Sequence, residues 1–177
     1  MMAITVDSIK ELREMTSCGV IECKNALEEA GGDFDKAKKI LQKRGLEIAA
    51  KKGSREAKEG RIETYIHQGN KVGVILEVNC ETDFVAKNED FVALTKDIAM
   101  QIVAANPKYI KKEDIPEDVL AEQKDQAAFI KESCLMEQPF IKDPKKTVQT
   151  LITDLVASVG ENIFVGRFTK YKVNEIV

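Results

Sequence analysis

Between Lys71 and Ile102 the chain changes from the period of a β-strand to the period of an α-helix, with only a short connection between the two. Apolar residues first occupy alternate positions, as in a strand with one buried face, at Val72, Val74, Leu76, Val78 and Cys80. They then recur at helical spacing, at Phe91, Leu94, Ile98 and Ile102. Asn88 is a favoured N-cap, and Glu89 and Asp90 suit the positive N-terminal end of a helix. The sequence therefore predicts a strand that leads almost directly into a helix.

The connection from Cys80 to Asn88 places an acidic residue, Asp83, beside a large aromatic one, Phe84. Buried phenylalanine is the usual case in globular proteins, so one interpretation has Phe84 folded back into the core and Asp83 capping a backbone turn. In the other interpretation both side chains face solvent. Rigid elements on both sides hold a binding loop in place, so the second interpretation makes this connection a candidate binding site.

A hairpin is predicted to deliver this connection. Residues 61–68 alternate between two sets of side chains, Ile62, Thr64 and Ile66 on one side and Glu63, Tyr65 and His67 on the other. Gly69-Asn70 then fits a two-residue type II′ turn. A further strand is expected from Asn162 to Val173, which is rich in β-branched and aromatic residues.

Helices occupy most of the remaining sequence after the hairpin. One is predicted from Glu117 to about Ser133. Another is predicted after Pro144, with apolar residues from Val148 to Val159 on its core face and Gly160 at its end. Strands and helices come in runs and do not repeat as βαβ units. The predicted fold class is therefore α+β, with helices packed on one face of an antiparallel sheet.

The first 45 residues predict three short helices. Thr5 or Ser8 caps the first. The second runs from Val20 to Ala30, and Gly31-Gly32 ends it. Asp33 caps the third, which is predicted to end at Gly45. The side chains expected to face the centre of this bundle are Ile9, Leu12, Met15, Val20, Cys23, Leu27, Ala30, Phe34, Ala37, Ile40 and Leu41.

Two domains follow from this pattern. Residues 46–60 are rich in Ala, Lys, Arg and Gly, which indicates a solvated helix that runs into a linker. We therefore expect a small N-terminal helical bundle with its linker helix in residues 1–54, and an α+β core domain in residues 55–177.

Charge and cysteine usage exclude several classes of function. The chain has 27 Lys and Arg against 30 Asp and Glu, so it lacks the basic field that direct nucleic-acid binding requires. No apolar run approaches the roughly 20 residues that span a bilayer, and the N-terminus lacks a signal-peptide pattern, so we expect a cytoplasmic protein with no membrane partner. The four cysteines form no Cys-x-x-Cys pair and there is one histidine, so we expect no metal site and no cofactor.

His67 and Cys80 leave one enzymatic alternative open. A thiol becomes a nucleophile when an imidazole contacts it and a third group orients that imidazole. If the two residues do not touch, they are an exposed strand histidine and a buried strand-end cysteine.

Segments along most of the chain resemble elongation factor Ts, the guanine-nucleotide exchange factor of the translational GTPase elongation factor Tu. The longest, Asn79 to Asn88, is similar to the signature of that family. Ile9–Thr16 and Cys23–Leu27 resemble its N-terminal module, whose ubiquitin-associated fold the predicted bundle also resembles. Glu137–Phe140 and Val159–Ile163 resemble its C-terminal core. The segments follow the order of the family's short, single-core form.

The resemblance implies a function without covalent chemistry and without a cofactor. Asp83 and Phe84 are expected to enter the nucleotide-binding domain of elongation factor Tu and to disturb its Mg²⁺ site, while Thr82 and Val85 shape the loop. A second set of residues, Arg13, Val20 and Ile21, matches positions at which the family's N-terminal module binds the same domain. In the alternative interpretation, Arg13 is a solvated surface residue and Val20 and Ile21 belong to the core of the bundle. A ubiquitin-type binding module is the remaining non-enzymatic alternative.

The resemblance also bears on oligomeric state. Short-form members pair their cores, so we expect a homodimer, or a complex with two copies of each partner. One departure affects this expectation. Between Pro116 and Glu137 the chain carries only a short helical segment, where short-form members usually have a longer, partly charged helical stretch.

Overall fold

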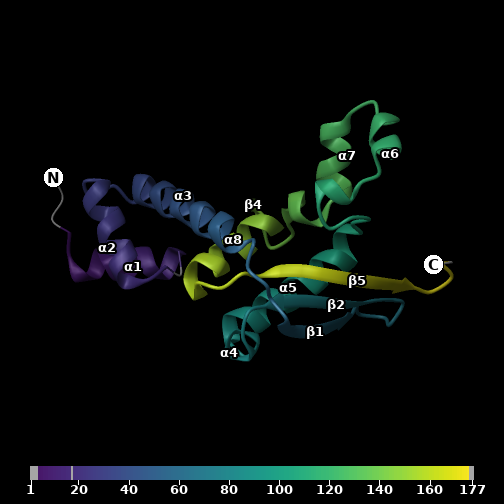
Figure 1. The fold of residues 1–177 in the computed structure, drawn as a ribbon, viewed down its shortest axis with the longest axis horizontal. Helices are drawn as coiled ribbons and strands as arrows, with labels where there is room; N and C mark the ends of the chain where they lie inside the picture. Colours follow the sequence, from purple (N-terminus) through teal and green to yellow (C-terminus); the bar gives the residue numbers. More distant parts are fainter. Residues whose placement is uncertain (1–3, 17, 176–177) are drawn as a thin grey trace. The chain divides into compact units, whose positions relative to one another are not determined.

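The computed structural model describes residues 4–16 and 18–175 of the chain. The chain divides into two compact units, Met1–Glu56 with Thr153–Asn162, and Ala57–Ile152 with Ile163–Val177. The first unit is helical, and the second combines helices with an antiparallel sheet (Figure 1). The predicted α+β class is confirmed.

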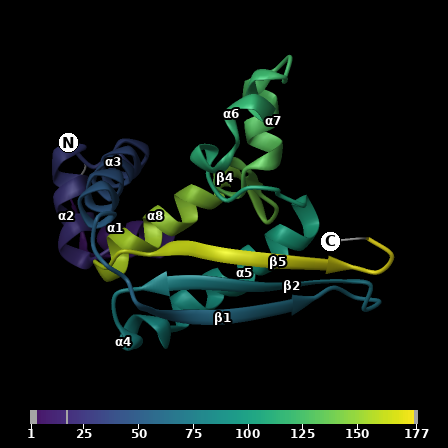
Figure 2. The same cartoon turned by 45° about the vertical axis from the view of Figure 1, so that its right-hand side comes forward.

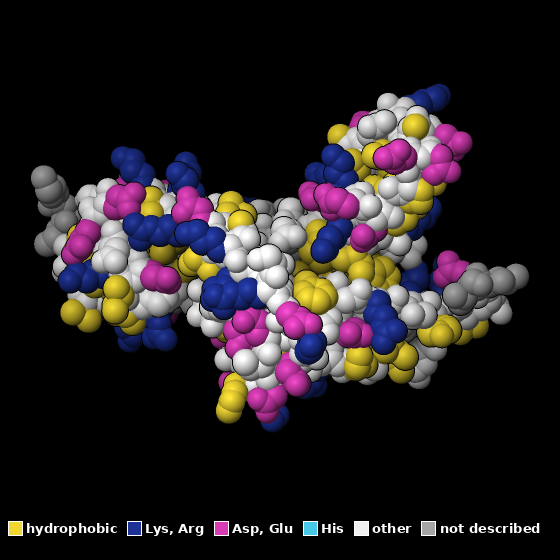
Figure 3. All heavy atoms as spheres, viewed as in Figure 1, with side chains coloured by type: hydrophobic (Ala, Val, Ile, Leu, Met, Phe, Trp, Pro, Cys, Tyr) yellow, Lys and Arg dark blue, Asp and Glu magenta, His cyan; other side chains and the backbone are white. Residues whose placement is uncertain are grey.

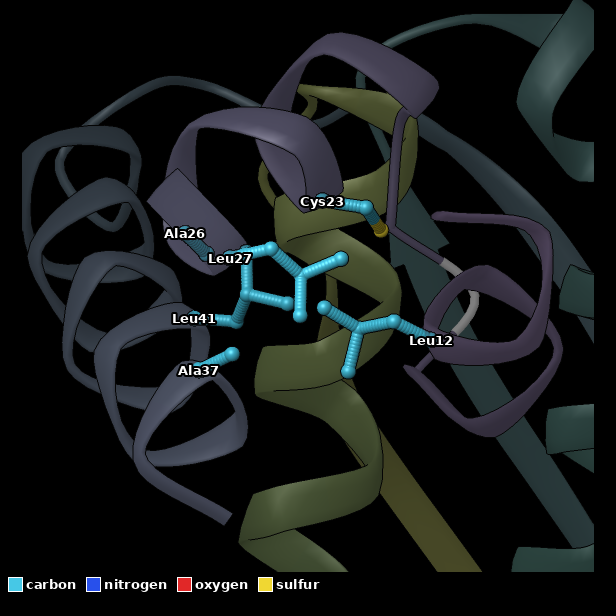
Figure 4. Close-up of a cluster of buried hydrophobic side chains, with 6 residues drawn as sticks. All are labelled: Leu12, Cys23, Ala26, Leu27, Ala37 and Leu41. Atoms are coloured by element: carbon cyan, nitrogen blue, oxygen red, sulfur yellow. The ribbon is translucent and has the colours of Figure 1, made fainter. Parts of the chain in front are cut away.

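The first unit is built around three N-terminal helices, α1 (Val6–Thr16), α2 (Val20–Glu29) and α3 (Phe34–Lys52). Side chains from all three converge on one apolar cluster (Figure 4), which consists of Leu12, Cys23, Ala26, Leu27, Ala37 and Leu41. The helical spacing of these buried residues confirms the three predicted helices. Residues 153–162, which include the C-terminal half of α8 (Val148–Val159), belong to the same unit.

Capping side chains set the starts of these helices where the sequence predicted them. The Ser8 N–H donates to Thr5 Oγ1 at 3.2 Å, and the Thr5 N–H donates to Ser8 Oγ at 3.0 Å. Asp33 Oδ1 accepts a hydrogen bond from the Lys36 N–H at 3.0 Å. Each bond satisfies a backbone donor that has no partner inside the helix.

The predicted end of the third helix at Gly45 is wrong. α3 continues to Lys52, and Gly45 is buried within it. A Cβ at Gly45 would lie 3.4 Å from Ala157 Cβ and 3.8 Å from Thr153 Cγ2. These are ordinary van der Waals distances, so Gly45 is an interior helix residue packed against another helical segment of the same unit and does not end the helix.

The second unit contains a three-stranded antiparallel sheet (Figure 2) in the order β1 (Glu59–Ile66), β2 (Val72–Cys80), β5 (Phe164–Lys172). The β1–β2 register runs from Glu59 opposite Cys80 to Ile66 opposite Gly73, so the predicted hairpin is confirmed. Its turn is not of type II′, because Asn70 has a φ of 55° where that turn needs a negative value. The predicted last strand is also confirmed as β5.

One face of this sheet is covered by α5 (Glu89–Ala105), which packs on β1 and β2. Val74, Leu76 and Val78 of β2 are at most 3% exposed on the covered face. The α5 residues facing them are buried as predicted, and they are Phe91, Leu94, Ile98 and Ile102. A strand and the helix that follows it thus share one core.

The opposite face of the sheet carries large apolar side chains that remain exposed. Ile62 and Ile66 of β1 are 58% and 66% exposed, and Ile75 of β2 is 50% exposed. On β1 the polar side of the strand faces α5 instead, where Glu63 is 9% exposed. Thr95 Oγ1 of α5 donates to Glu63 Oε2 at 3.3 Å, and Arg61 Nε donates to the same oxygen at 3.0 Å, so the buried carboxylate is satisfied.

The remaining elements of the second unit differ in part from the prediction. The single helix expected over Glu117–Ser133 is two helices, α6 (Glu117–Ala121) and α7 (Gln126–Ser133), because Asp125 caps a new start with its Oδ1 accepting from the Ala128 N–H. A short hairpin of β3 (Pro139–Phe140) and β4 (Asp143–Thr147) was not predicted. α8 ends before Gly160, as predicted. Within residues 4–16 and 18–175, no helix combines the length and apolar character needed to cross a bilayer.

Candidate functional site

The connection between β2 and α5 contains a single helical turn, α4 (Asp83–Ala86). The sequence predicted a loop here, and the structure adds one turn of helix within it. We call residues 82–88 the tip turn. It brings four of the predicted site residues together, with Thr82 as the N-cap and Asp83, Phe84 and Val85 in the helical turn itself.

Hydrogen bonds hold the tip turn at both ends. At its start, Thr82 Oγ1 accepts from the Val85 N–H at 3.4 Å, and the buried Cys80 thiol donates to the Thr82 carbonyl at 3.1 Å. At its end, Asn88 Oδ1 accepts from the Asp90 N–H at 2.7 Å and so caps α5. Val85 is 8% exposed and anchors the turn to the core. The backbone of the turn is therefore fixed before any partner is present.

Phe84 points away from the core that Val85 enters. It is 82% exposed, more than any other large apolar side chain in the described part of the chain. The interpretation that folds Phe84 back into the core is therefore wrong. Over α4, the surface combines hydrophobic and acidic side chains (Figure 3).

Asp83 lies beside Phe84 in an ion pair with Lys87. The Lys87 Nζ to Asp83 Oδ2 distance is 2.7 Å, and the two residues are four positions apart, one turn of helix. The hydrogen bond from the Lys87 ammonium holds the pKa of Asp83 below its usual value, and the same bond raises the pKa of Lys87. Asp83 is thus a charged carboxylate at neutral pH. Because its folded-state pKa is lowered, the small contribution of the pair to stability is lost only as the pH falls through that lowered value.

The other three predicted site residues lie in the first unit. Arg13 is exposed in the last turn of α1, and Val20 and Ile21 are 55% and 74% exposed at the start of α2. The interpretation of Val20 as bundle core is therefore wrong. Met15 was also predicted to face the core, but it is 50% exposed. Met15 has helical spacing with Ile9 and Leu12, and for this reason the sequence predicted a buried side chain. Spacing alone does not show which residue of such a stripe lies beyond the edge of the core.

The thiol-enzyme alternative is wrong. Cys80 pairs with Glu59 at one end of the hairpin, whereas His67 follows Ile66, which pairs with Gly73 at the other end. Seven residues of strand at about 3.4 Å each separate the two ends by roughly 24 Å. His67 Nδ1 instead contacts the Tyr65 hydroxyl at 3.1 Å. In the described part of the chain, no group of three or more His, Cys, Asp and Glu side chains is placed to hold a metal ion.

A family comparison matches residues 14–128 to the family described as "Elongation factor TS". The matched range includes the tip turn as well as Val20 and Ile21. It ends within α7, before the last strand of the sheet.

Whole-chain relatives carry the same description. An elongation factor Ts from Thermodesulfovibrio yellowstonii is 51% identical over 196 residues, with 98% of this chain and 98% of the relative covered. One from Caldanaerobacter subterraneus is 48% identical over 195 residues, covering 97% of this chain and 98% of the relative. One from Carboxydothermus hydrogenoformans is 46% identical, covering 97% and 90%. Because these alignments are longer than the 177 residues of the chain, the relatives contain residues without a counterpart here.

The opposite placements of Val85 and Phe84 predict opposite effects on stability. Val85→Ala should lower the free energy of unfolding by about 1–2 kcal/mol, because it removes buried methyl groups. Phe84→Ala should change it by no more than about 0.5 kcal/mol, as for other surface substitutions. Urea denaturation of both variants beside the unmodified protein measures the two values. A loss of about 3 kcal/mol for Phe84→Ala would contradict the exposed placement of its ring.

Proposed function

The chain belongs to the elongation factor Ts family, and on this premise we propose that it promotes the release of GDP from elongation factor Tu. The observation that supports the proposal best is Phe84, an aromatic side chain 82% exposed beside a charged carboxylate on a turn fixed at both ends. A large apolar side chain in this position has no role in folding. Its exposure is explained if it is buried in a partner.

The mechanism rests on the reciprocity of binding free energies. If this protein binds nucleotide-free elongation factor Tu more tightly than the GDP form, it must weaken GDP binding by the same factor by which GDP weakens its own binding. GDP release is then faster without any covalent step. The function is therefore that of an exchange factor and not of an enzyme, and it requires no cofactor in this chain.

In this mechanism, the tip turn makes the contacts that are stronger with nucleotide-free elongation factor Tu than with its GDP form. Phe84 enters the nucleotide-binding domain as an apolar wedge, and burial of its ring is worth about 1.5–3 kcal/mol. Asp83 makes polar contacts beside it, and its negative charge acts near a Mg²⁺ ion, which is often the largest local charge of a nucleotide site. Because Thr82 and Val85 already fix the backbone, little conformational entropy is lost on docking. The interaction energy is then available to disturb the Mg²⁺ and nucleotide contacts.

The first unit provides affinity in this proposal. Ile21 and Val20 are apolar and exposed at the start of α2, and Arg13 is exposed on α1. Arginine is among the residues enriched at interface hot spots, and the two exposed apolar side chains offer surface that a partner can bury. We assign these residues to binding the same partner, with no part in nucleotide displacement. The partner assignment and the net charge of −3 favour a cytoplasmic protein that binds neither nucleic acid nor membrane directly.

We also propose that the chain forms a homodimer, so that its complex with the partner contains two copies of each. The supporting observation is the exposed face of the sheet, where Ile62, Ile66, Ile75 and Tyr171 are all at least 50% exposed. A hollow of about 520 Å³ lies at the hairpin end of this face, between Ile66, Ile75, Tyr171 and Val173. Two apolar sheet faces bury each other in a sandwich about 10 Å thick, and a two-fold axis lets one surface serve both copies.

Phe84→Ala should slow stimulated GDP release by about 30-fold or more, because loss of an interface anchor costs about 2 kcal/mol or more. Asp83→Ala should act in the same direction with a smaller effect. The measurement is release of labelled GDP from elongation factor Tu as a function of the concentration of this protein. Val6→Ala is the matched control, since Val6 is 81% exposed but lies in α1. Equal rates for Phe84→Ala and Val6→Ala would show that Phe84 has no part in exchange.

Ile21→Ala should raise the concentration that gives half-maximal stimulation by about tenfold, because an anchor residue contributes more than about 1 kcal/mol. The maximal rate should stay within about twofold if the first unit supplies affinity only. Titration in the same GDP-release assay separates the two quantities. Leu46→Ala is the control, as Leu46 is 54% exposed on α3. A reduced maximal rate with unchanged half-maximal concentration would contradict this division of roles.

Ile75→Lys should convert the dimer into a monomer, because it places a charge at the centre of the exposed sheet face where burial would leave it unpaired. Light scattering at tens of micromolar measures the mass of both proteins. Ala93→Lys, at an exposed position of α5, controls for the added charge. A monomeric unmodified protein together with a one-to-one complex would refute the dimer.

A further inference from the structure

Asp83 and Lys87 are joined twice across the tip turn. The Lys87 backbone N–H donates to the Asp83 carbonyl at 3.2 Å, and the Lys87 ammonium donates to Asp83 Oδ2 at 2.7 Å. α4 has only four residues, and a helix this short is not stable by itself because the first turn fixes several residues for one hydrogen bond. Its geometry therefore depends on contacts such as these.

The charges around the tip turn make Lys87 distinctive. From residue 81 to residue 90 the chain has four acidic side chains, Glu81, Asp83, Glu89 and Asp90, and Lys87 is the single basic residue. Glu59, at the start of β1, also acts electrostatically on the Lys87 ammonium. Lys87 is thus the local counter-ion in an acidic neighbourhood.

Global stability does not explain this pair. The side chains of Lys87 and Asp83 are 76% and 51% exposed, and exposed ion pairs contribute little to the free energy of unfolding. Its effect is local, because it fixes one rotamer of a carboxylate that is adjacent to the exposed ring of Phe84. A site whose side chains are already oriented binds with a smaller loss of conformational entropy.

We propose that Lys87 is a positioning residue of the tip turn, which holds the Asp83 carboxylate oriented beside Phe84 before the partner arrives. This inference rests on the proposed exchange function. Lys87 acts through Asp83 and makes no essential contact of its own with the partner. Removal of its charge therefore weakens exchange only while Asp83 is present.

Four variants of the full chain test this role. Lys87→Met removes the charge and keeps the length of the side chain, and Lys87→Arg keeps the charge. Asp83→Asn and the double variant Asp83→Asn/Lys87→Met complete a double-mutant cycle. Lys96→Met is the matched control, because Lys96 is exposed on α5 outside the tip turn. Melting curves of all variants should coincide with that of the unmodified protein.

The first readout is the titration of the Asp83 carboxyl carbon by NMR in the free protein. Lys87→Met should raise the apparent pKa of Asp83, and Lys87→Arg and Lys96→Met should leave it low. A merely structural role of Lys87 would not produce this pattern. An unchanged Asp83 titration in Lys87→Met would overturn the positioning role, whatever the exchange rates are.

The second readout is stimulated GDP release from elongation factor Tu. Lys87→Met should slow it by about two- to fivefold, the range that an exposed ion pair provides, and Lys87→Arg should restore most of the rate. In the Asp83→Asn background, Lys87→Met should have no further effect. An equal additional loss in that background would show a direct contact of Lys87 with the partner and overturn the proposal. No stimulation by the unmodified protein would instead overturn the proposed function, and the positioning role with it.

Discussion

The packing of α5 on the inner face of β1 and β2 is the interaction on which the rest of the second unit depends. Val74, Leu76 and Val78 of β2 are buried in this core, as are Phe91 and Ile98 of α5. The chain between them is therefore held at both ends by apolar burial. Such burial is worth roughly 1.5–3 kcal/mol for each large side chain. The connection has little freedom to move as long as this core is intact.

This constraint explains how an exposed aromatic side chain is tolerated. Val85 occupies the single inward position of the tip turn, so its neighbour Phe84 must point outward. The caps at Thr82 and Asn88 and the thiol of Cys80 remove the alternatives that would let Phe84 turn back into the core. The free energy lost by exposing the ring is offset by the core on either side. The exposed ring of Phe84 is the surface that a partner can bury, and the Asp83–Lys87 ion pair lies beside it.

Exposed apolar surface also occurs elsewhere, including one face of the sheet and the start of α2. On the sheet, Ile62, Ile66 and Ile75 form one face because Glu63 occupies the opposite, buried face of β1 with Thr95 and Arg61 as partners. In the first unit, Ile21 is excluded from a cluster already filled by side chains of α1, α2 and α3. Isolated exposed apolar residues are ordinary, but contiguous ones mark interaction surfaces.

The sequence by itself determined the local elements. Period and capping residues identified the N-terminal helices, the hairpin, α5, α8 and β5, and the resemblance at Asn79–Asn88 indicated the family and the site. Only the tertiary structure decided which faces these elements bury. Alternation along β1 shows that the strand has two faces. It does not show that Glu63 is buried and Ile62 exposed, because that depends on the α5 side chains that pack against the strand, such as Thr95. Gly45 and Phe84 follow the same rule. Gly45 lies inside a helix and packs against residues 153–162 of the same unit. Phe84 is exposed while its neighbour Val85 is buried. Neither placement can be inferred from local sequence.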